Sequence, residues 1–361
     1  MQRIAHILGK TSGSAAERSI INYYRAIDKA EVQFDFFLCK GSEYLPAEEI
    51  KSLGGRIFVL PPQLERKRYG SVLERLLREN CYDIVQCHCG KLAAISLKAA
   101  KNAGIKNRIL HCHSSAERAG AAKKYATEFL AGCESAARAC FGAVPVCTLS
   151  EQGPPVAVAR VLPSALDISR CGYSKERRSK ARRELNIPQG SLVFGSAGEL
   201  SAKNNQVFLI DVFKEILRQN KNSVLVIVVT GRESEYIKAR IAASGVSDRI
   251  KLLSRADEGF YAALDCFMLP QKSAGFPFSA VEAQSAGVYC ILSDKISREA
   301  KLTDSAQFLS LKAGAADWAC AAVCCASLKN KKAAEQLKAA GYDIRENAEA
   351  LQKYYQTLRE L

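Results

Sequence analysis

The sequence predicts an α/β protein built on two doubly wound sheets of parallel strands. Short apolar runs alternate with longer amphipathic segments almost throughout, as in chains whose strands alternate with helices. At 361 residues the chain is longer than the chains that usually fold around one hydrophobic core. We therefore expect two domains of about 150–180 residues each. One loop, with Pro154, Pro155 and Pro163, interrupts the pattern. We interpret it as the connection between the domains, because proline does not serve in a central strand.

The first half of the chain contains seven predicted strands, each a short apolar run. Amphipathic patterns between them predict helices, three of which cover residues 18–27, 69–80 and 93–104. The predicted strands are Ile4–Leu8, Phe34–Leu38, Arg56–Leu60, Asp83–Cys87, Arg108–His111, Phe129–Cys133 and Pro145–Leu149.

The alternation restarts at Leu192 with runs that are apolar throughout, a composition that suits strands buried on both faces. The last segment of the chain is amphipathic and helical. Because no strand follows it, we expect it to pack across the domain junction. Helices are predicted over 205–219 and 234–244, and strands over Leu192–Gly198, Val224–Val229, Ile250–Leu253, Cys266–Leu269 and Tyr289–Leu292.

The formal net charge of +15 favours anionic partners such as nucleotides, phosphoryl groups or acidic lipid surfaces. The densest basic cluster runs from Ser174 to Leu185. We interpret it as a solvated helix face, with docking to anionic lipid as the alternative. Nucleic acid is not expected as a partner, because the basic residues are not interleaved with stacking aromatic residues.

The composition, 48% hydrophobic and 25% charged, is that of an ordinary globular protein. No apolar run approaches the roughly 20 residues needed to span a bilayer, and the first run is too short for a signal peptide. We therefore expect a cytoplasmic protein. Most of the 14 cysteines are predicted to be small buried hydrophobic residues, as in the apolar runs that contain Cys266, Cys290, Cys324 and Cys325.

Open α/β sheets bind ligands beyond the carboxyl ends of their strands, which directs attention to four loops. The most informative is Pro270–Gly287, which follows an apolar run and leads into a predicted helix over Ser279–Ala286. The free N–H groups at a helix start favour anions, so this segment predicts a nucleotide or phosphate site. A second loop, Ser196–Gln206, contains Lys203, and a third, Lys10–Ser19, contains Gly13.

The fourth feature is a pair of strand ends, Cys87-His88-Cys89 and His111-Cys112-His113. Imidazole and thiolate groups bind zinc, and the two ends would meet if the strands were adjacent. The cysteines and histidines lack the two-to-four-residue ligand spacing of structural zinc sites, so we expect no metal.

Several segments together resemble the retaining glycosyltransferases of family 4, and they cover nearly the whole chain in the family's order. The resemblance implies the GT-B fold, with two doubly wound Rossmann-like domains that face each other across a cleft. It implies an acceptor-side domain over 1–168, a nucleotide-sugar donor domain over 169–335 and a terminal helix over 336–361. The segments are IKSLGGRIFVLPP, YDIVQCH, VLPSALDISR, SAGELSAKNNQ, PQKSAGFPFSAVEAQSAG and DIRENAEALQKYY.

The resemblance also implies roles for residues of the donor domain. Lys203 matches a lysine that binds the donor diphosphate, and Glu282 matches an acid that binds the ribose. The stretch Gly275, Phe276 and Pro277 approaches the sugar and base. Two positions depart from the family, because Glu199 stands where an arginine is usual and Ala274 replaces a second acid.

On the acceptor side, His113 matches a catalytic histidine that lies beside the transferred sugar, and His88 lines the acceptor. The loop at Gly13 has Ser14 and Ala15 where the family has two glycines, and a simple strand-to-helix turn is the alternative for it.

The resemblance implies transfer of a hexosyl-type sugar, with retention, from a nucleotide-sugar such as a UDP-sugar. The acceptor would be a polysaccharide or lipid-linked saccharide at the inner membrane face, with the nucleotide-sugar as co-substrate and no other cofactor. Two alternatives remain at this point. The altered positions Glu199 and Ala274 favour a catalytically weak or inactive homologue that acts as a binding or partner subunit, and a GT-B epimerase is the other alternative.

Overall fold

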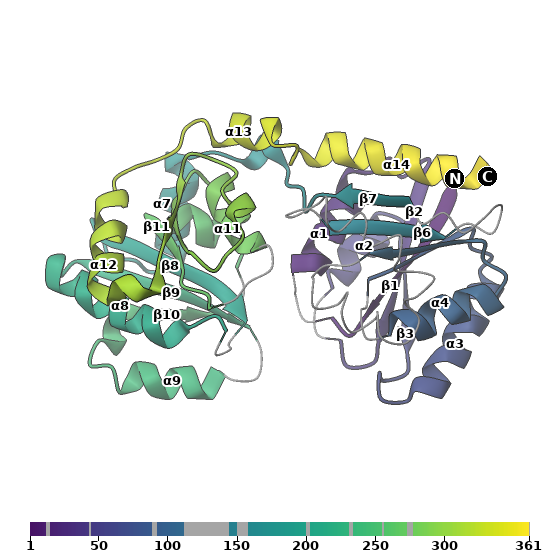
Figure 1. The fold of residues 1–361 in the computed structure, drawn as a ribbon, viewed down its shortest axis with the longest axis horizontal. Helices are drawn as coiled ribbons and strands as arrows, with labels where there is room; N and C mark the ends of the chain where they lie inside the picture. Colours follow the sequence, from purple (N-terminus) through teal and green to yellow (C-terminus); the bar gives the residue numbers. More distant parts are fainter. Residues whose placement is uncertain are drawn as a thin grey trace. The chain divides into compact units, whose positions relative to one another are not determined.

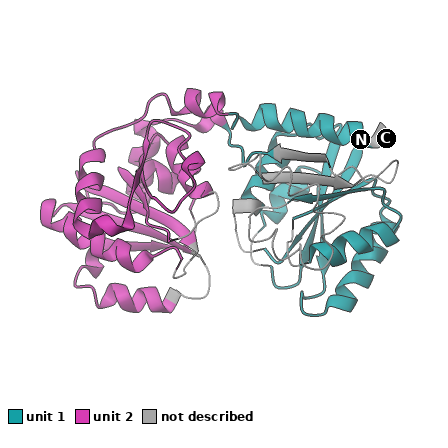
Figure 2. Ribbon diagram, in the orientation of Figure 1, with its two compact units in different colours: residues 1–167, 341–361 teal, residues 168–340 magenta. Residues whose placement is uncertain are grey.

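The computed structural model describes residues 1–11, 15–42, 45–88, 92–111, 144–149, 158–199, 203–230, 234–254, 256–272 and 277–360. The chain forms two compact units (Figure 2). Unit 1 comprises Met1–Asp167 and Gly341–Leu361, and unit 2 comprises Ile168–Ala340. Each unit is an α/β structure with a largely parallel sheet, as the alternation of apolar and amphipathic segments predicts (Figure 1).

The described strands of unit 1 form a seven-stranded sheet with the order β3-β2-β1-β4-β5-β6-β7. The first five strands in this order are parallel, whereas β6 is antiparallel to both of its neighbours. The strands are β1 (Gln2–Gly9), β2 (Val32–Cys39), β3 (Arg56–Leu60), β4 (Ile84–Cys87), β5 (Asn107–His111), β6 (Val144–Leu149) and β7 (Val158–Leu162).

Helices cover both faces of this sheet. The helices α1 (Ala15–Ala26) and α14 (Ile344–Glu360) enclose one core, while α3 (Arg66–Glu79) and α4 (Ala93–Asn102) enclose the other. The short α2 (Ala47–Ser52) precedes β3. In α3 the buried residues Tyr69, Leu73 and Leu77 recur every four positions, so they form the single apolar stripe that the sheet requires.

The interpretation of the proline loop as a domain connection holds only for its end, because the chain passes from unit 1 to unit 2 after Asp167, four residues beyond Pro163. β7 lies between Pro155 and Pro163 and pairs with β6, so this segment completes the sheet of unit 1. The expectation of a wholly parallel sheet fails at the same place. β7 is the last strand of the described sheet, and an edge position tolerates flanking prolines. The predicted strand Phe129–Cys133 lies outside the described residues.

The end of the chain belongs to unit 1, whereas the expected division treated residues 336–361 as a separate terminal helix. The helix α13 (Ala333–Ala339) lies in unit 2, and α14 packs on α1 within unit 1. The Asn107 side chain donates a hydrogen bond of 2.8 Å to the Leu358 carbonyl, which joins α14 to β5. The terminal helix therefore contributes to the core of the first sheet.

Unit 2 contains a six-stranded sheet of described strands, all parallel, in the order β10-β9-β8-β11-β12-β13. The short, partly polar β13 has no counterpart among the predicted strands. The strands are β8 (Leu192–Glu199), β9 (Ser223–Thr230), β10 (Ile250–Leu253), β11 (Cys266–Leu269), β12 (Tyr289–Ser293) and β13 (Ala306–Leu309).

The core of unit 2 lies on both faces of this sheet. One face is covered by helices α8, α9 and α12, with the buried Trp318 of α12 among them. The other is covered by α7, α10 and α11. The bounds are α7 (Lys175–Glu184), α8 (Gln206–Gln219), α9 (Ser234–Ala242), α10 (Glu258–Ala263), α11 (Phe278–Ser285) and α12 (Gly314–Cys325).

The described cysteines are free thiols, and the prediction of buried positions holds for Cys266, Cys290 and Cys325. It is wrong for Cys324, which is exposed together with Cys320. Both lie on the outer face of α12, where a run of small residues conceals the helical period that separates inside from outside.

Among the residues that the structure describes, each unit contains a buried aspartate bound by two arginines. In unit 1, Asp35 of β2 accepts hydrogen bonds from Arg3 of β1, Arg56 of β3 and Tyr82. The distances to Arg3 Nη2, Arg56 Nη2 and Tyr82 Oη are 2.5, 2.6 and 2.7 Å. Burial alone would raise the pKa of Asp35, but the hydrogen bonds from Arg3, Arg56 and Tyr82 outweigh it and lower that pKa to about 2.

The corresponding residue of unit 2 is Asp265, which directly precedes β11. Arg178 and Arg182 of α7 each donate to one of its carboxylate oxygens at 2.5 Å, and Lys329 Nζ lies 3.4 Å away. The Val193 amide of β8 donates to the same carboxylate at 2.8 Å. The basic cluster on α7 is therefore only partly the solvated face that the sequence predicts.

Asp265→Asn should destabilise unit 2 by about 3 kcal/mol, because it leaves three partly buried cations without their anion. Urea unfolding followed by circular dichroism would measure this change. The control is Asp248→Asn, at an exposed aspartate, which should stay within about 0.5 kcal/mol of the wild type. Equal midpoints for Asp265→Asn and the wild type would contradict the proposed importance of Asp265.

Candidate functional site

The sheet of unit 2 changes direction between β8 and β11. From β8 the chain proceeds to β9 and β10 on one side, and from β11 it proceeds to β12 and β13 on the other. Ligands of open α/β sheets bind at such a switch point, outside the carboxyl ends of the two strands. The loop with Lys203 follows β8, and Pro270 follows β11. Two of the four loops selected from the sequence therefore flank the switch point.

These two loops are joined by hydrogen bonds. The Lys272 amide donates to the Lys203 carbonyl at 2.8 Å, and the Gln271 side chain donates to Asn204 Oδ1 at 2.7 Å. The Ser293 hydroxyl, at the end of β12, donates to the Gln271 carbonyl at 2.5 Å. A Cβ atom at position 198 would lie 3.1 Å from the side-chain nitrogen of Asn204, which is a tight contact. Glycine at this position avoids that contact with Asn204. The backbone of Lys272 is thus fixed beside that of Lys203.

The predicted donor-binding residues of this unit are described to different extents. The Lys203 side chain is exposed, and Pro277 is buried at the start of α11. Glu199 is the last residue of β8, and its side chain is outside the described part. Gly275 and Phe276 lie outside the described residues, as does Ala274.

Glu282 is half-buried on α11 and accepts a hydrogen bond of 2.8 Å from the Tyr261 hydroxyl of α10. Tyr261 is only 3% exposed, and its ring packs against those of Phe260 and Phe267. Tyr261 could not be recognised from the sequence, because nothing local connects it to an acid on the next helix. The available signal was a single hydroxyl within an apolar helix.

The sheet of unit 1 has its switch point between β1 and β4. The loop after β1 contains Gly13 and Ser14, which lie outside the described residues, and Ala15 is the first residue of α1. His88 follows β4, and its amide donates to the Ile7 carbonyl at 2.8 Å. Its side chain is buried. His113 lies outside the described residues.

Three buried imidazoles form a row across β1, β4 and β5. His6 Nδ1 lies 3.0 Å from His88 Nε2, and the rings of His88 and His111 have centroids 5.0 Å apart. Tyr355 of α14 donates to Gln86 Oε1, so the Gln86 amide donates to His111 Nδ1 at 3.1 Å. This arrangement assigns the proton of neutral His111 to Nε2. Helix α14 therefore orients the histidine at the end of β5.

Cys87 and His111 do not share a metal site. Cys87 packs with Val85 and Leu110 on the face covered by α3 and α4. His111 lies on the opposite face, where it contacts Gln86, the residue that Tyr355 of α14 also contacts. Cys89 and His113 fall outside the described residues. Within the described part of the chain, no group of three or more potential ligands is arranged to hold a metal ion.

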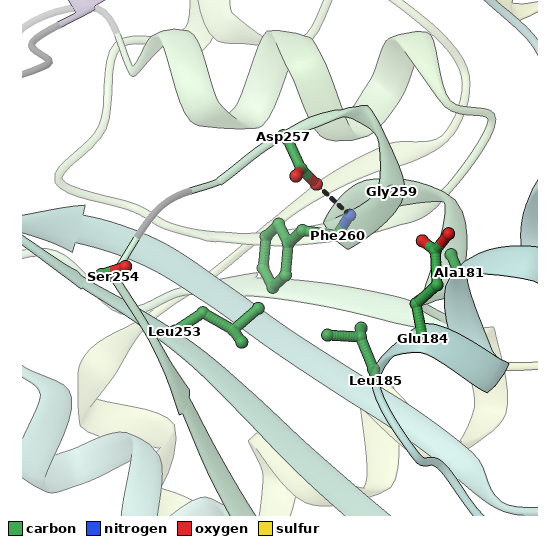
Figure 3. A pocket seen from close by; sticks show the side chains of 8 residues that line it. All are labelled: Ala181, Glu184, Leu185, Leu253, Ser254, Asp257, Gly259 and Phe260. Atoms are coloured by element: carbon green, nitrogen blue, oxygen red, sulfur yellow. Dashed lines mark hydrogen bonds between the residues drawn. The ribbon is translucent and has the colours of Figure 1, made fainter.

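A cavity of about 450 Å³ lies between α7, the end of β10 and α10 (Figure 3). Asp257 caps α10 by accepting a hydrogen bond of 2.9 Å from the Phe260 amide. Two carboxylates make the cavity unfavourable for a phosphate. None of the predicted site residues lines it; its lining comprises Ala181, Glu184, Leu185, Leu253, Ser254, Asp257, Gly259 and Phe260.

Comparison with known proteins identifies the kind of enzyme. The family described as "Glycosyl transferases group 1" matches residues 177–343, and these lie almost entirely in unit 2. The putative glycosyltransferase EpsF of Bacillus subtilis (strain 168) is 25% identical, over 98% of this chain and 96% of its own length. A galactosyltransferase of Escherichia coli is 26% identical over 62% of this chain and 60% of its own. The chain is a glycosyltransferase.

Solved structures show the same fold as this glycosyltransferase. HepE of Anabaena, in complex with UDP-glucose, matches with a TM-score of 0.72 at 19% identity, and both chains are covered completely. Sucrose-phosphate synthase from Thermosynechococcus elongatus matches with a TM-score of 0.70 at 14% identity, again over both whole chains. The fold is GT-B, as the resemblance implies. Among the described residues, every helix is too short or too polar to cross a bilayer.

Burial lowers the pKa of His6 to about 3, although the charge of Asp35 opposes this shift. The folded protein therefore holds His6 neutral, while the unfolded chain binds a proton below its ordinary pKa of 6.5. Stability should fall between about pH 6.5 and pH 3, by at most about 1.4 kcal/mol per pH unit.

His6→Phe should remove this contribution, since the ring would pack against Phe34 without a titrating nitrogen. Urea unfolding at several pH values measures the slope for both proteins. Identical slopes for the variant and the wild type would contradict the assignment.

Proposed function

We propose that this glycosyltransferase moves a hexosyl-type sugar, with retention of anomeric configuration, from a UDP-linked donor to a saccharide or lipid-linked saccharide. The observation that carries the proposal is the hydrogen-bonded pair of loops at the switch point of unit 2. It brings the Lys203 loop beside the segment that leads to Glu282. The names of one relative and one solved structure support this choice of donor and acceptor. The E. coli relative is a UDP-Gal:alpha-D-GlcNAc-diphosphoundecaprenol alpha-1,3-galactosyltransferase, and HepE was solved with UDP-glucose.

Each residue has a role in this proposal that its chemistry supports. The ammonium group of Lys203 offsets negative charge that develops on the leaving diphosphate. The carboxylate of Glu282 accepts hydrogen bonds from the ribose hydroxyls, and Tyr261 holds that carboxylate in place. Pro277 shapes the approach to sugar and base together with Gly275 and Phe276.

On the acceptor side of the proposal, His113 orients the transferred sugar or the acceptor hydroxyl, and His88 lines the acceptor. The net charge of +15 supports peripheral contact with an anionic membrane at its cytoplasmic face, where a lipid-linked acceptor would lie. Lys175, Lys180 and Arg183 of α7 are exposed and available for such contact. Metal ions and further cofactors have no part in the proposed reaction.

The decisive experiment combines a UDP titration with a screen of nucleotide-sugars, with and without lipid-linked acceptors. We expect UDP to bind, and we expect Lys203→Ala to lower kcat/KM by about 10- to 100-fold, because it removes a charge-assisted contact to phosphate. Lys221→Ala, at an exposed lysine before β9 and thus at the other end of the sheet, is the matched control. If UDP produces neither heat nor a thermal shift, the proposed UDP-linked donor is wrong; if the screen of nucleotide-sugars also shows no transfer, a binding or partner role for this chain is favoured instead. Unchanged sugar transfer by the Lys203→Ala variant would contradict the proposed role of Lys203 in binding the diphosphate.

Tyr261→Phe should raise the KM for the donor by about fivefold to tenfold with little change in kcat, because it removes the hydrogen bond that positions Glu282. In a Glu282→Gln background the same substitution should have little further effect. Steady-state kinetics of both single variants and the double variant test this coupling. The control is Tyr236→Phe, at a tyrosine that is 62% exposed on α9. Additive effects of the Tyr261 and Glu282 substitutions would show that Tyr261 acts independently of Glu282.

A further inference from the structure

Lys272 is a second cation at the switch point of unit 2. It lies three residues beyond the end of β11, and its side chain is exposed like that of Lys203. The hydrogen bond of 2.8 Å from the Lys272 amide to the Lys203 carbonyl places the two backbones side by side. Both lysines therefore start from neighbouring points at the carboxyl edge of the sheet.

The position of Lys272 is fixed by more than this one contact. The preceding residue, Gln271, donates from its side chain to Asn204 at 2.7 Å and accepts at its carbonyl from Ser293 at 2.5 Å. These bonds connect the loops after β8 and β11 with each other and with the last residue of β12. Because three strand ends hold the loop, Lys272 presents its charge from a fixed backbone, and a fixed backbone loses less entropy when a ligand binds.

Lys203 and Lys272 have no anionic partner among the described side chains. In this they differ from the basic residues that bind Asp265. Lys329 is bound to Asp265, and Asp294 at the end of β12 pairs with Lys295 at 3.7 Å. Ammonium groups carried by two neighbouring backbones repel each other when they approach, and a bound dianion between them replaces that repulsion with attraction. Lysine is a point-charge ligand for phosphate groups.

We propose that Lys272 binds the diphosphate of the nucleotide-sugar together with Lys203. The inference extends the proposed function and depends on it. A diphosphate carries negative charge on both of its phosphoryl groups, so it can contact two ammonium groups at once. Each lysine then contributes separately to nucleotide affinity, and the contribution depends on the charge of the ligand.

Isothermal titration with UDP and with uridine tests the proposal on the full chain. Lys272→Ala should weaken UDP binding by about tenfold, as the loss of one charge-assisted contact requires, and should leave the much weaker binding of uridine unchanged. Lys272→Arg should stay close to the wild type because it keeps the charge. Lys203→Ala and Lys203→Ala/Lys272→Ala complete the series, and Lys221→Ala controls for the loss of one positive charge from unit 2. Thermal unfolding of each variant verifies the fold, and Lys272→Gln retains most of the side-chain length if the alanine variant is unstable.

The outcomes separate this inference from the proposed function. If the wild type does not bind UDP, both fail together. If Lys203→Ala weakens UDP binding and Lys272→Ala does not, the inference about Lys272 is overturned while the proposed function stands. An equal loss in Lys272→Ala and Lys221→Ala would also overturn it, because the effect would then be one of overall charge. Losses in UDP affinity that are specific to both loop lysines support it.

Discussion

A buried aspartate bound by two arginines is the interaction on which each unit depends. A carboxylate can be buried only if cations and hydrogen bonds replace the water it loses, and removing one partner leaves uncompensated charge. Asp265 satisfies this condition with Arg178, Arg182 and the Val193 amide, so α7, β8 and the start of β11 must meet at one place. Asp35 imposes the same condition on β1, β2 and β3.

This constraint extends to the candidate donor site of unit 2. Arg178 and Arg182 also donate to the carbonyls of Ala263 and Leu264, where α10 ends, and Asp257 caps its start. Helix α10 has only six residues and would be marginal without these contacts. Because it is held at both ends, it presents the Tyr261 hydroxyl to Glu282 at a fixed distance. The arginines of α7 therefore contribute to the candidate donor site indirectly, because they fix the position of α10.

The basic residues of unit 2 fall into two groups that differ in their position. Arg178 and Arg182 face inward and neutralise a buried acid, while Lys203 and Lys272 occupy the carboxyl edge of the sheet. The net charge alone could not separate these groups. In unit 1, desolvation lowers the pKa of His6, so this member of the row with His88 and His111 stays neutral.

The amino-acid sequence alone determined the α/β class, the parallel sheet of unit 2 and the loops at both switch points. Continuous apolar runs encode buried strands locally, which is why the predicted bounds of β10 and β11 agree with the structure. The tertiary structure alone decided the antiparallel β6 and β7, the return of α14 to unit 1, and the pairs formed by Tyr261 with Glu282 and by Lys272 with Lys203. These features depend on contacts between segments that are distant along the chain. Hydrophobic periodicity reports which face of an element is buried, but it does not report which distant residue lies opposite.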